Sequence, residues 1–135
     1  MRQDDNLAIS VPAGPRAVSE ALAAVREFFK IGQCDADDRA HLAIIVEELV
    51  LNIVEHGQAP EGDPIDIRFS RADDGIRLEI VDGGTHFDPR DAEPPGDPPP
   101  ERGGGAGIAL VLAWSQILSY ERRDGRNHMV LLLDE

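Results

Sequence analysis

The sequence predicts an α+β domain in which helices cover one face of a mixed, mostly antiparallel sheet. Two kinds of periodicity support this fold class. Residues 41–57 place apolar side chains at the three- and four-residue spacing of a helix. Residues 65–69 and 76–80 instead alternate apolar and polar side chains, as strands do when one face of their sheet meets solvent. With 135 residues, 41% hydrophobic and 29% charged, the chain has the size and composition of a single domain spanning residues 1–135.

The first 40 residues predict a strand and then a helix. Residues 7–11 alternate weakly and precede a proline, which would end a strand. Residues 13–30 carry apolar positions at helical spacing, with a Gly-Pro pair near the start and a glycine after the end. The acids within residues 35–38 then offer caps for the long helix that follows.

The second half predicts two strand pairs with a helix between them. The two alternating strands flank Asp73-Asp74-Gly75, a hairpin turn signal, so they are expected to be antiparallel neighbours. Residues 108–114 are expected to be helical. Two closing strands are expected at residues 116–120 and 128–133, joined by a turn at residues 124–127.

Three polar side chains interrupt the apolar surface of the long helix. Glu48, Asn52 and His56 are four residues apart, so they form one line along the helix. Carboxylates and amides are costly to bury without partners. The line therefore faces solvent, a satisfied polar network, or a cavity that holds a polar ligand. In the last case Asn52 suits Mg²⁺, and Glu48 can accept a hydroxyl proton. Gly57 is expected to end the helix as its C′ glycine.

A second candidate site follows a predicted strand. Asp82 stands at the strand end, and Gly83 and Gly84 come directly after it. Glycine lets the backbone approach a ligand closely, and an aspartate there can accept a hydrogen bond from an exocyclic amine. The alternative is a strand-capping aspartate in an ordinary glycine turn. The residues alone leave both interpretations open.

A glycine run at residues 103–107 opens directly into the helix predicted at 108–114. Free backbone N–H groups and the helix dipole favour phosphate at such a position. The run lacks the Gly-Lys-Ser/Thr of a Walker A motif, and no parallel βαβ unit surrounds it. Residues 91–102 before it are Pro-rich and acidic, so they are neither helix nor central strand. They form either a lid over a ligand or a plain mobile loop.

The charge and the cysteine count exclude several classes of function. The formal net charge is −13, from 13 Lys+Arg and 26 Asp+Glu, which disfavours nonspecific binding to nucleic acid or anionic membrane. It fits a basic protein partner, or a nucleotide delivered with Mg²⁺. Cys34 is the only cysteine, which excludes an internal disulfide and a cysteine-based zinc site. No signal peptide and no run of about 18 apolar residues is present, so we expect a cytoplasmic protein.

Three motifs stand in a fixed order along the chain. They are Glu48-x-x-x-Asn52 on a helix, Asp82-x-Gly84 after a strand, and the glycine run of residues 103–107 at a helix start. Each is weak alone, but the ordered set resembles the GHKL ATP-binding superfamily. Gyrase-type topoisomerases and sensor histidine kinases belong to that superfamily.

Further features narrow the resemblance. The short length, Phe87-Asp88-Pro89 after the aspartate, and the ending at residues 120–127 are similar to anti-sigma factor serine/threonine kinases of bacterial partner-switching systems. The similarity covers residues 7–133. It implies a two-layer α/β sandwich of the GHKL (Bergerat) type, with three helices on one face of the sheet. The ATP site is then expected between the long helix and a Pro-rich lid over about residues 89–104.

The resemblance also implies roles for individual residues. Asn52 matches the family's Mg²⁺-binding asparagine, and Glu48 matches the carboxylate proposed as catalytic base. Asp82 matches the aspartate that reads the adenine amino group, and Gly84 the glycine beside it. Arg102, just before the glycine-rich box, is expected at the terminal phosphate. The glycines of the box are also expected to contact the nucleotide: Gly103, Gly104, Gly105 and Gly107.

The implied function is that of an ATP- and Mg²⁺-dependent protein kinase and anti-sigma regulator. Such a protein sequesters a sigma factor and phosphorylates a Ser or Thr on a STAS-type anti-sigma-factor antagonist. The family often forms homodimers. The negative charge of this chain leads us to expect no direct binding to nucleic acid and no binding to membrane. Two other functions stay open. One is an ATP-binding switch without kinase activity, in which ATP orders the lid and changes partner affinity. The other is a detached ATPase-like module of a larger signalling system.

Overall fold

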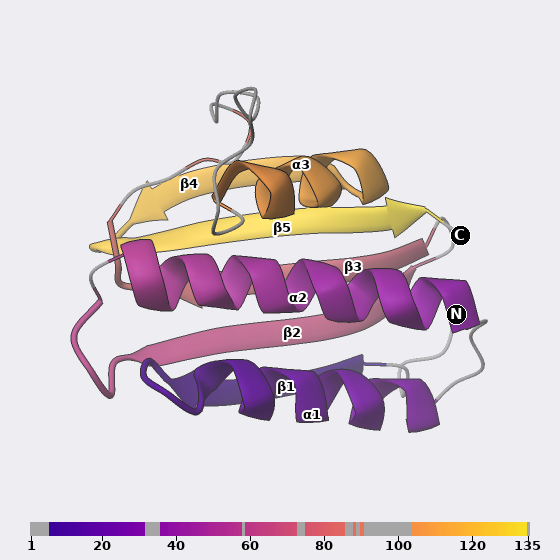
Figure 1. Ribbon diagram of the computed structural model, residues 1–135, viewed down its shortest axis with the longest axis horizontal. Helices are drawn as coiled ribbons and strands as arrows, with labels where there is room; N and C mark the ends of the chain where they lie inside the picture. Colours follow the sequence, from indigo (N-terminus) through magenta and orange to yellow (C-terminus); the bar gives the residue numbers. More distant parts are fainter. Residues whose placement is uncertain are drawn as a thin grey trace.

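The computed structural model, shown in Figure 1, describes residues 6–31, 36–57, 59–72, 75–85, 88, 90 and 104–134. This part of the chain forms three helices and five strands. In chain order they are β1 (Asn6–Pro12), α1 (Ala17–Ile31), α2 (Ala36–His56), β2 (Pro64–Ala72), β3 (Gly75–Asp82), α3 (Gly104–Trp114), β4 (Gln116–Arg123) and β5 (Arg126–Asp134). Among the described residues, no helix is both long enough and apolar enough to cross a membrane.

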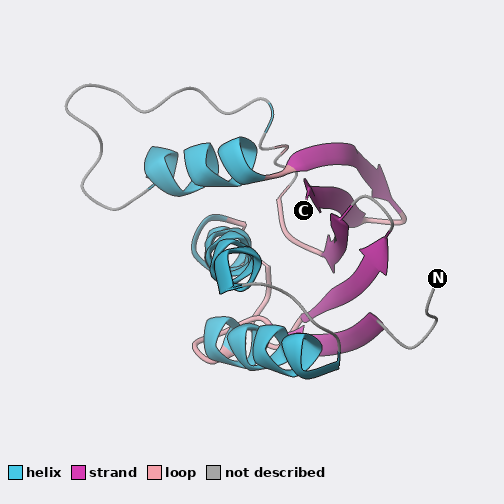
Figure 2. Cartoon of the chain, turned by 90° about the vertical axis from the view of Figure 1, so that its right-hand side faces the viewer, coloured by secondary structure: helices cyan, strands magenta, loops and turns pink. Residues whose placement is uncertain are grey.

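The elements form two layers, which are seen edge-on in Figure 2. One layer is a sheet with strand order β1-β2-β3-β5-β4, and the other contains the three helices, all on the same face. The predicted fold class is therefore confirmed. Every neighbouring pair of described strands is antiparallel, so the parallel pair of a mixed sheet is not found among them. The reason is that β5 runs between β3 and β4 and is antiparallel to both.

Helix α2 is the centre of the helix layer. It lies between α1 and α3 and runs antiparallel to both (Figure 1). Its apolar residues are packed into the core as the helical spacing predicted, and the most buried of them are Leu42, Ile45, Val46, Leu49 and Val50. The helix begins at Ala36, about one turn before the stretch that the apolar pattern identifies, because its first turn is acidic and polar.

Helix α1 is held to the sheet by aromatic packing. Phe28 is fully buried, and its ring stacks on that of Phe69 in β2 with centroids 5.5 Å apart. The helix begins at Ala17, whereas the sequence predicted a start at residue 13. Residues 13–16 form a bend and a turn instead, and Ala13 is bonded outside the helix: its N–H donates to the Asp63 carbonyl and its own carbonyl accepts from the N–H of Gly62, both at 2.8 Å. These bonds tie the start of α1 to the segment before β2.

The closing hairpin is tighter than predicted. Only Asp124 and Gly125 separate β4 from β5, and both have positive φ, 54° and 76°. A two-residue turn with this geometry matches the twist of the flanking strands. Arg126 and Asn127, which the prediction assigned to the turn, are therefore strand residues. The hairpin between β2 and β3 is confirmed as antiparallel, although Asp73 and Asp74 lie outside the described residues.

Phe28→Ala tests whether the aromatic contact between α1 and β2 anchors the helix layer. Removal of a fully buried phenylalanine ring leaves a cavity, and such changes cost about 3–5 kcal/mol of unfolding free energy. We expect a loss of that size in urea denaturation. Phe29→Ala, on the half-buried neighbour, is the control and should cost clearly less. Equal losses for both variants would contradict this role for Phe28.

Candidate functional site

The polar line predicted on α2 is found on the helix, but its members differ in exposure. Glu48 and Asn52 are half-buried, whereas His56 is exposed. Neither Glu48 nor Asn52 makes a side-chain hydrogen bond to any other described residue. The line is therefore not a satisfied internal network within the described part of the chain. Its first two members remain able to bind a ligand.

Glu48 faces the first turn of α3. A Cβ atom added to Gly107, the fourth residue of α3, would overlap the Glu48 carboxylate and lie 3.0 Å from its Cγ. Gly107 itself is buried. Because the first four N–H groups of a helix have no partner within the helix, this turn offers donors to an anion. The contact therefore brings a carboxylate and an anion-binding helix start to the same place.

The environment of Glu48 changes its acidity. Partial burial raises the pKa of the Glu48 carboxyl above its ordinary value, and the carboxylates of Glu47 and Glu55 add to this effect. A carboxylate with a raised pKa is a better proton acceptor at neutral pH than an ordinary surface glutamate. Glu48 is thus both positioned at a helix start and adjusted towards general-base chemistry.

Asn52 lies one helical turn after Glu48 on the same line. Its amide oxygen is a hard ligand of the kind that Mg²⁺ prefers. No group of three or more His, Cys, Asp and Glu side chains suited to a metal occurs among the described residues. The donor set fits a cation that is held by one or two protein oxygens and by the phosphates of a nucleotide, which is the usual mode for Mg²⁺.

Asp82 ends β3 in a buried position, with 7% of its surface exposed. Its Oδ1 accepts the N–H of Gly84 at 2.8 Å and the Nδ2 of Asn127 at 3.1 Å. Within the described residues Oδ2 has no hydrogen-bond partner, so it can accept a bond from an exocyclic amine. The bond from Gly84 is the one expected of an aspartate that caps a strand in a glycine turn. The buried bond from Asn127 is an additional link between Asp82 and β5.

The loop after Asp82 docks on the end of α2. The N–H of Thr85 donates to the carbonyl of Gly57 at 2.5 Å. A Cβ atom on Gly84 would lie only 2.7 Å from the same carbonyl oxygen, so only glycine fits there without a shift. Gly57 does follow the last helical residue, as predicted. Its φ is not positive, however, and its role differs from that of a left-handed C′ glycine.

Asn127 is a site residue that sequence reasoning missed. It is 1% exposed, and its Nδ2 donates to the carbonyls of Gly84 at 3.0 Å and Thr85 at 3.3 Å, besides Asp82. Its Oδ1 accepts from Nη1 of Arg122 at 2.8 Å, and the same nitrogen also donates to the Gly84 carbonyl. Asn127 therefore fixes the glycine loop from the neighbouring strand.

A signal for Asn127 was present in the sequence. The buried residues of β5 include Met129, Leu131 and Leu133, which alternate along the strand. Asn127 is in phase with them, so the pattern places an amide on the buried face of the sheet. A polar residue in that phase needs hydrogen-bond partners, and the Asp82 loop supplies them.

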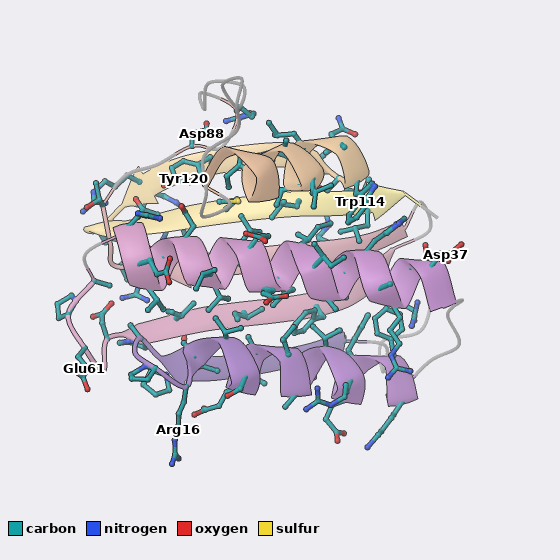
Figure 3. The ribbon with its side chains drawn as sticks, in the orientation of Figure 1. Arg16, Asp37, Glu61, Asp88, Trp114 and Tyr120 are labelled. Carbon is teal, nitrogen blue, oxygen red and sulfur yellow. The ribbon has the colours of Figure 1, made fainter. Side chains whose placement is uncertain are left out.

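The far end of α3 is also fixed to α2. The rings of His41 and Trp114 stack with centroids 4.2 Å apart and planes inclined by 18°. Figure 3 shows Trp114 at the end of α3 that lies beside the start of α2, where Asp37 is labelled. This stack and the Gly107 contact lie at opposite ends of α3. Together they set the position of α3 along α2.

Some predicted site residues lie outside the described part of the chain. Arg102 and Gly103 do, as does most of the segment expected to be a lid, of which Arg90 and Gly104 are described. The backbones of Gly104 and Gly105 belong to the first turn of α3, as expected for a glycine-rich box at a helix start. The structure thus brings together Glu48 with Gly107, and Asp82 with Gly84.

Comparison with known proteins agrees with this geometry. Residues 11–133 match the histidine kinase-like ATPase domain family. The chain is 33% identical over 137 residues to the serine/threonine-protein kinase BtrW of Bordetella bronchiseptica, a match that covers 94% of this chain and 91% of that protein.

A solved structure shares the fold. The crystal structure of the RsbU and RsbW domains of Rv1364c from Mycobacterium tuberculosis superimposes with a TM-score of 0.66 at 22% identity. The match covers 96% of this chain and 32% of that one, so the chain spans about a third of that larger protein. The order of motifs, the fold and the family match agree, and this chain belongs to the histidine kinase-like ATPase domain family.

Proposed function

We propose that this protein binds ATP with Mg²⁺ at a site formed by the polar side of α2, the first turn of α3 and the loop after Asp82. Three features support this. Asp82 presents an acceptor suited to the adenine amino group, and the start of α3 presents free N–H groups suited to phosphate. Asn52 lies one turn from Glu48 and supplies an oxygen for Mg²⁺. Arg102 and Gly103, which lie outside the described residues, would complete the phosphate end.

The reaction we propose is phosphoryl transfer from ATP to a Ser or Thr hydroxyl of a protein. The observation that carries it is the position of Glu48, whose carboxylate lies against Gly107 with a raised pKa. Glu48 would accept the hydroxyl proton as the oxygen attacks the terminal phosphate. Mg²⁺, when bound, would neutralise charge on the phosphates. The name of the Bordetella relative, a serine/threonine-protein kinase, supports the same chemistry.

The partners we propose follow from the relatives. The substrate would be a STAS-type anti-sigma-factor antagonist, and the protein itself would sequester a sigma factor. A homodimer is the assembly to test. The net charge of −13 favours a basic surface on at least one of them.

A second function is favoured by one feature of the sequence. Residues 94–100 contain five prolines and come just before the glycine box. Proline restricts the backbone, and a lid that closes poorly would leave ATP exposed to water. The protein would then act as a switch whose ATP changes partner affinity without transfer of phosphate.

Asn52→Ala tests the Mg²⁺ ligand. Loss of the amide oxygen should weaken binding of Mg·ATP at least tenfold, or about 1.4 kcal/mol, in isothermal titration calorimetry. His56→Ala is the matched control, because His56 is on the same line one turn further and is exposed. It should bind like the wild type. Equal wild-type affinity with and without Mg²⁺ would rule out this role for Asn52.

Glu48→Gln separates the kinase from the switch. Glutamine keeps the shape of the side chain but is not a base, so transfer of radiolabel from ATP to the antagonist should slow by about 10²–10⁴-fold. ATP binding should persist, because Asn52 and the α3 start are unchanged. Glu20→Gln, which changes an exposed glutamate on α1 away from the site, is the control and should keep the wild-type rate.

The two functions predict different results. A switch gives no label transfer even from the wild-type protein, while ATP still changes its affinity for a partner. A kinase that Glu48→Gln leaves at full rate would show that Glu48 is not the base.

Thermal melts of Glu48→Gln test whether a lost transfer rate is caused by unfolding of the variant. Since the pKa of Glu48 is raised by folding from 4.5, the ionised form is disfavoured in the fold. Glu48→Gln should therefore be at least as stable as wild type at neutral pH, and this advantage should disappear as the pH falls below 4.5.

A further inference from the structure

A cavity of about 280 Å³ opens between the second half of α1 and the first turns of α2. We call it the α1–α2 pocket, and its lining residues are Ala23, Arg26, Glu27, Phe29, Lys30 and Arg39. The pocket lies away from the proposed nucleotide site. Arg39 precedes Glu48 by nine residues, or about 14 Å along the helix. The proposed nucleotide site is on the α3 side of α2, where Glu48 lies against Gly107, whereas the pocket is lined by α1 residues and Arg39. Figure 1 shows α2 between these two helices.

The lining of the pocket is positively charged, although the chain as a whole is strongly negative. Three of its six lining residues are cationic and one is acidic, whereas the chain carries 26 acids against 13 Lys+Arg. Lys30 pairs with Glu27 at 3.3 Å, but both side chains are largely exposed, so the pair is weak. Arg26 and Arg39 are exposed and form no ion pair with any other described residue. Two guanidinium groups are thus available at its rim.

The aromatic part of the pocket is Phe29, which packs against Phe28 and Arg71. Phe29 is half-buried, and its ring meets that of the fully buried Phe28 edge to face, with centroids 5.6 Å apart. The guanidinium of Arg71 in β2 lies 4.9 Å from the Phe28 ring centroid and 5.8 Å from that of Phe29. The Phe29 ring is therefore packed against Phe28 and Arg71, and Arg71 is a fourth cation near the pocket.

We propose that the α1–α2 pocket is a docking site for an acidic segment of a partner protein. Arginine binds carboxylates through two parallel hydrogen bonds, and Arg26 and Arg39 come from different helices that flank one opening. The methylene groups of an Asp or Glu side chain would pack on Phe29. The volume is at the low end of small-molecule sites, about 300–1,000 Å³, and suits one or two side chains better than a nucleotide. The inference rests on the proposed function only in requiring a protein partner; it does not depend on ATP.

The test uses a fluorescein-labelled hexaglutamate peptide and fluorescence anisotropy at low salt. Wild-type protein should bind the peptide in spite of its net charge of −13. R26E/R39E should weaken the binding at least tenfold, or about 1.4 kcal/mol. R16E/R77E carries the same change in charge on two exposed arginines, at the start of α1 and on the open face of the sheet, and should bind as the wild type does. R26Q/R39Q replaces the reversal variant if that protein does not fold, and the same loss is expected.

Several results would overturn the proposal. The first is that the wild type does not bind hexaglutamate. The second is an equal loss of binding in R26E/R39E and R16E/R77E, and the third is that the wild type binds a hexalysine peptide as well as hexaglutamate. Displacement of the peptide by tripolyphosphate at lower concentration than by unlabelled hexaglutamate would make the pocket a phosphate site instead. Calorimetry with Mg·ATP on R26E/R39E keeps the two ideas apart. Its ATP affinity should be unchanged, whatever the outcome with the peptide.

Discussion

The site depends on two places where a glycine allows one segment to come within contact distance of helix α2. At one of them Gly84 lies against the carbonyl of Gly57, which also accepts a hydrogen bond from Thr85. At the other Gly107 lies against the carboxylate of Glu48. A side chain at Gly84 would meet the backbone of Gly57 and separate the segments, and one at Gly107 would displace the Glu48 carboxylate. These two approaches bring the end of β3 and the start of α3 to the same helix, although about 20 residues separate them in the chain.

Both approaches concern the polar side of a helix that is otherwise a core element. The rest of α2 is fixed by burial, since Leu42, Ile45 and Val46 have no exposed surface. Burial of this kind leaves the helix little freedom to rotate, so the positions of Glu48 and Asn52 on its polar side are fixed. The loop after Asp82 is fixed in turn by Asn127 from β5, with donors to three of its oxygens. The candidate site is thus positioned by the core rather than by its own loops.

The sequence predicted the elements well because they depend on local periodicity. The apolar spacing of α2 and the alternation of β2 and β3 each require a single face to be buried. Asn127 was missed for two reasons. The predicted turn at residues 124–127 was two residues too long, and its partners Asp82 and Thr85 are 45 and 42 residues away in the chain. The α1–α2 pocket could not be predicted either. Arg26 and Arg39 read as ordinary solvated charges on two helices, and only the packing of α1 on α2 makes them neighbours. The roles of Arg102 and Gly103 remain predictions.

A crystal structure of the protein with Mg²⁺ and a non-hydrolysable ATP analogue would test most directly whether the polar side of α2 forms the nucleotide site. We expect the adenine amino group at Oδ2 of Asp82, the phosphates at the first turn of α3, and the amide oxygen of Asn52 bound to Mg²⁺. We also expect Glu48 beside the terminal phosphate without a bond to the metal. A nucleotide bound elsewhere, or one whose metal has no contact with Asn52, would show that the polar side of α2 is not the nucleotide site.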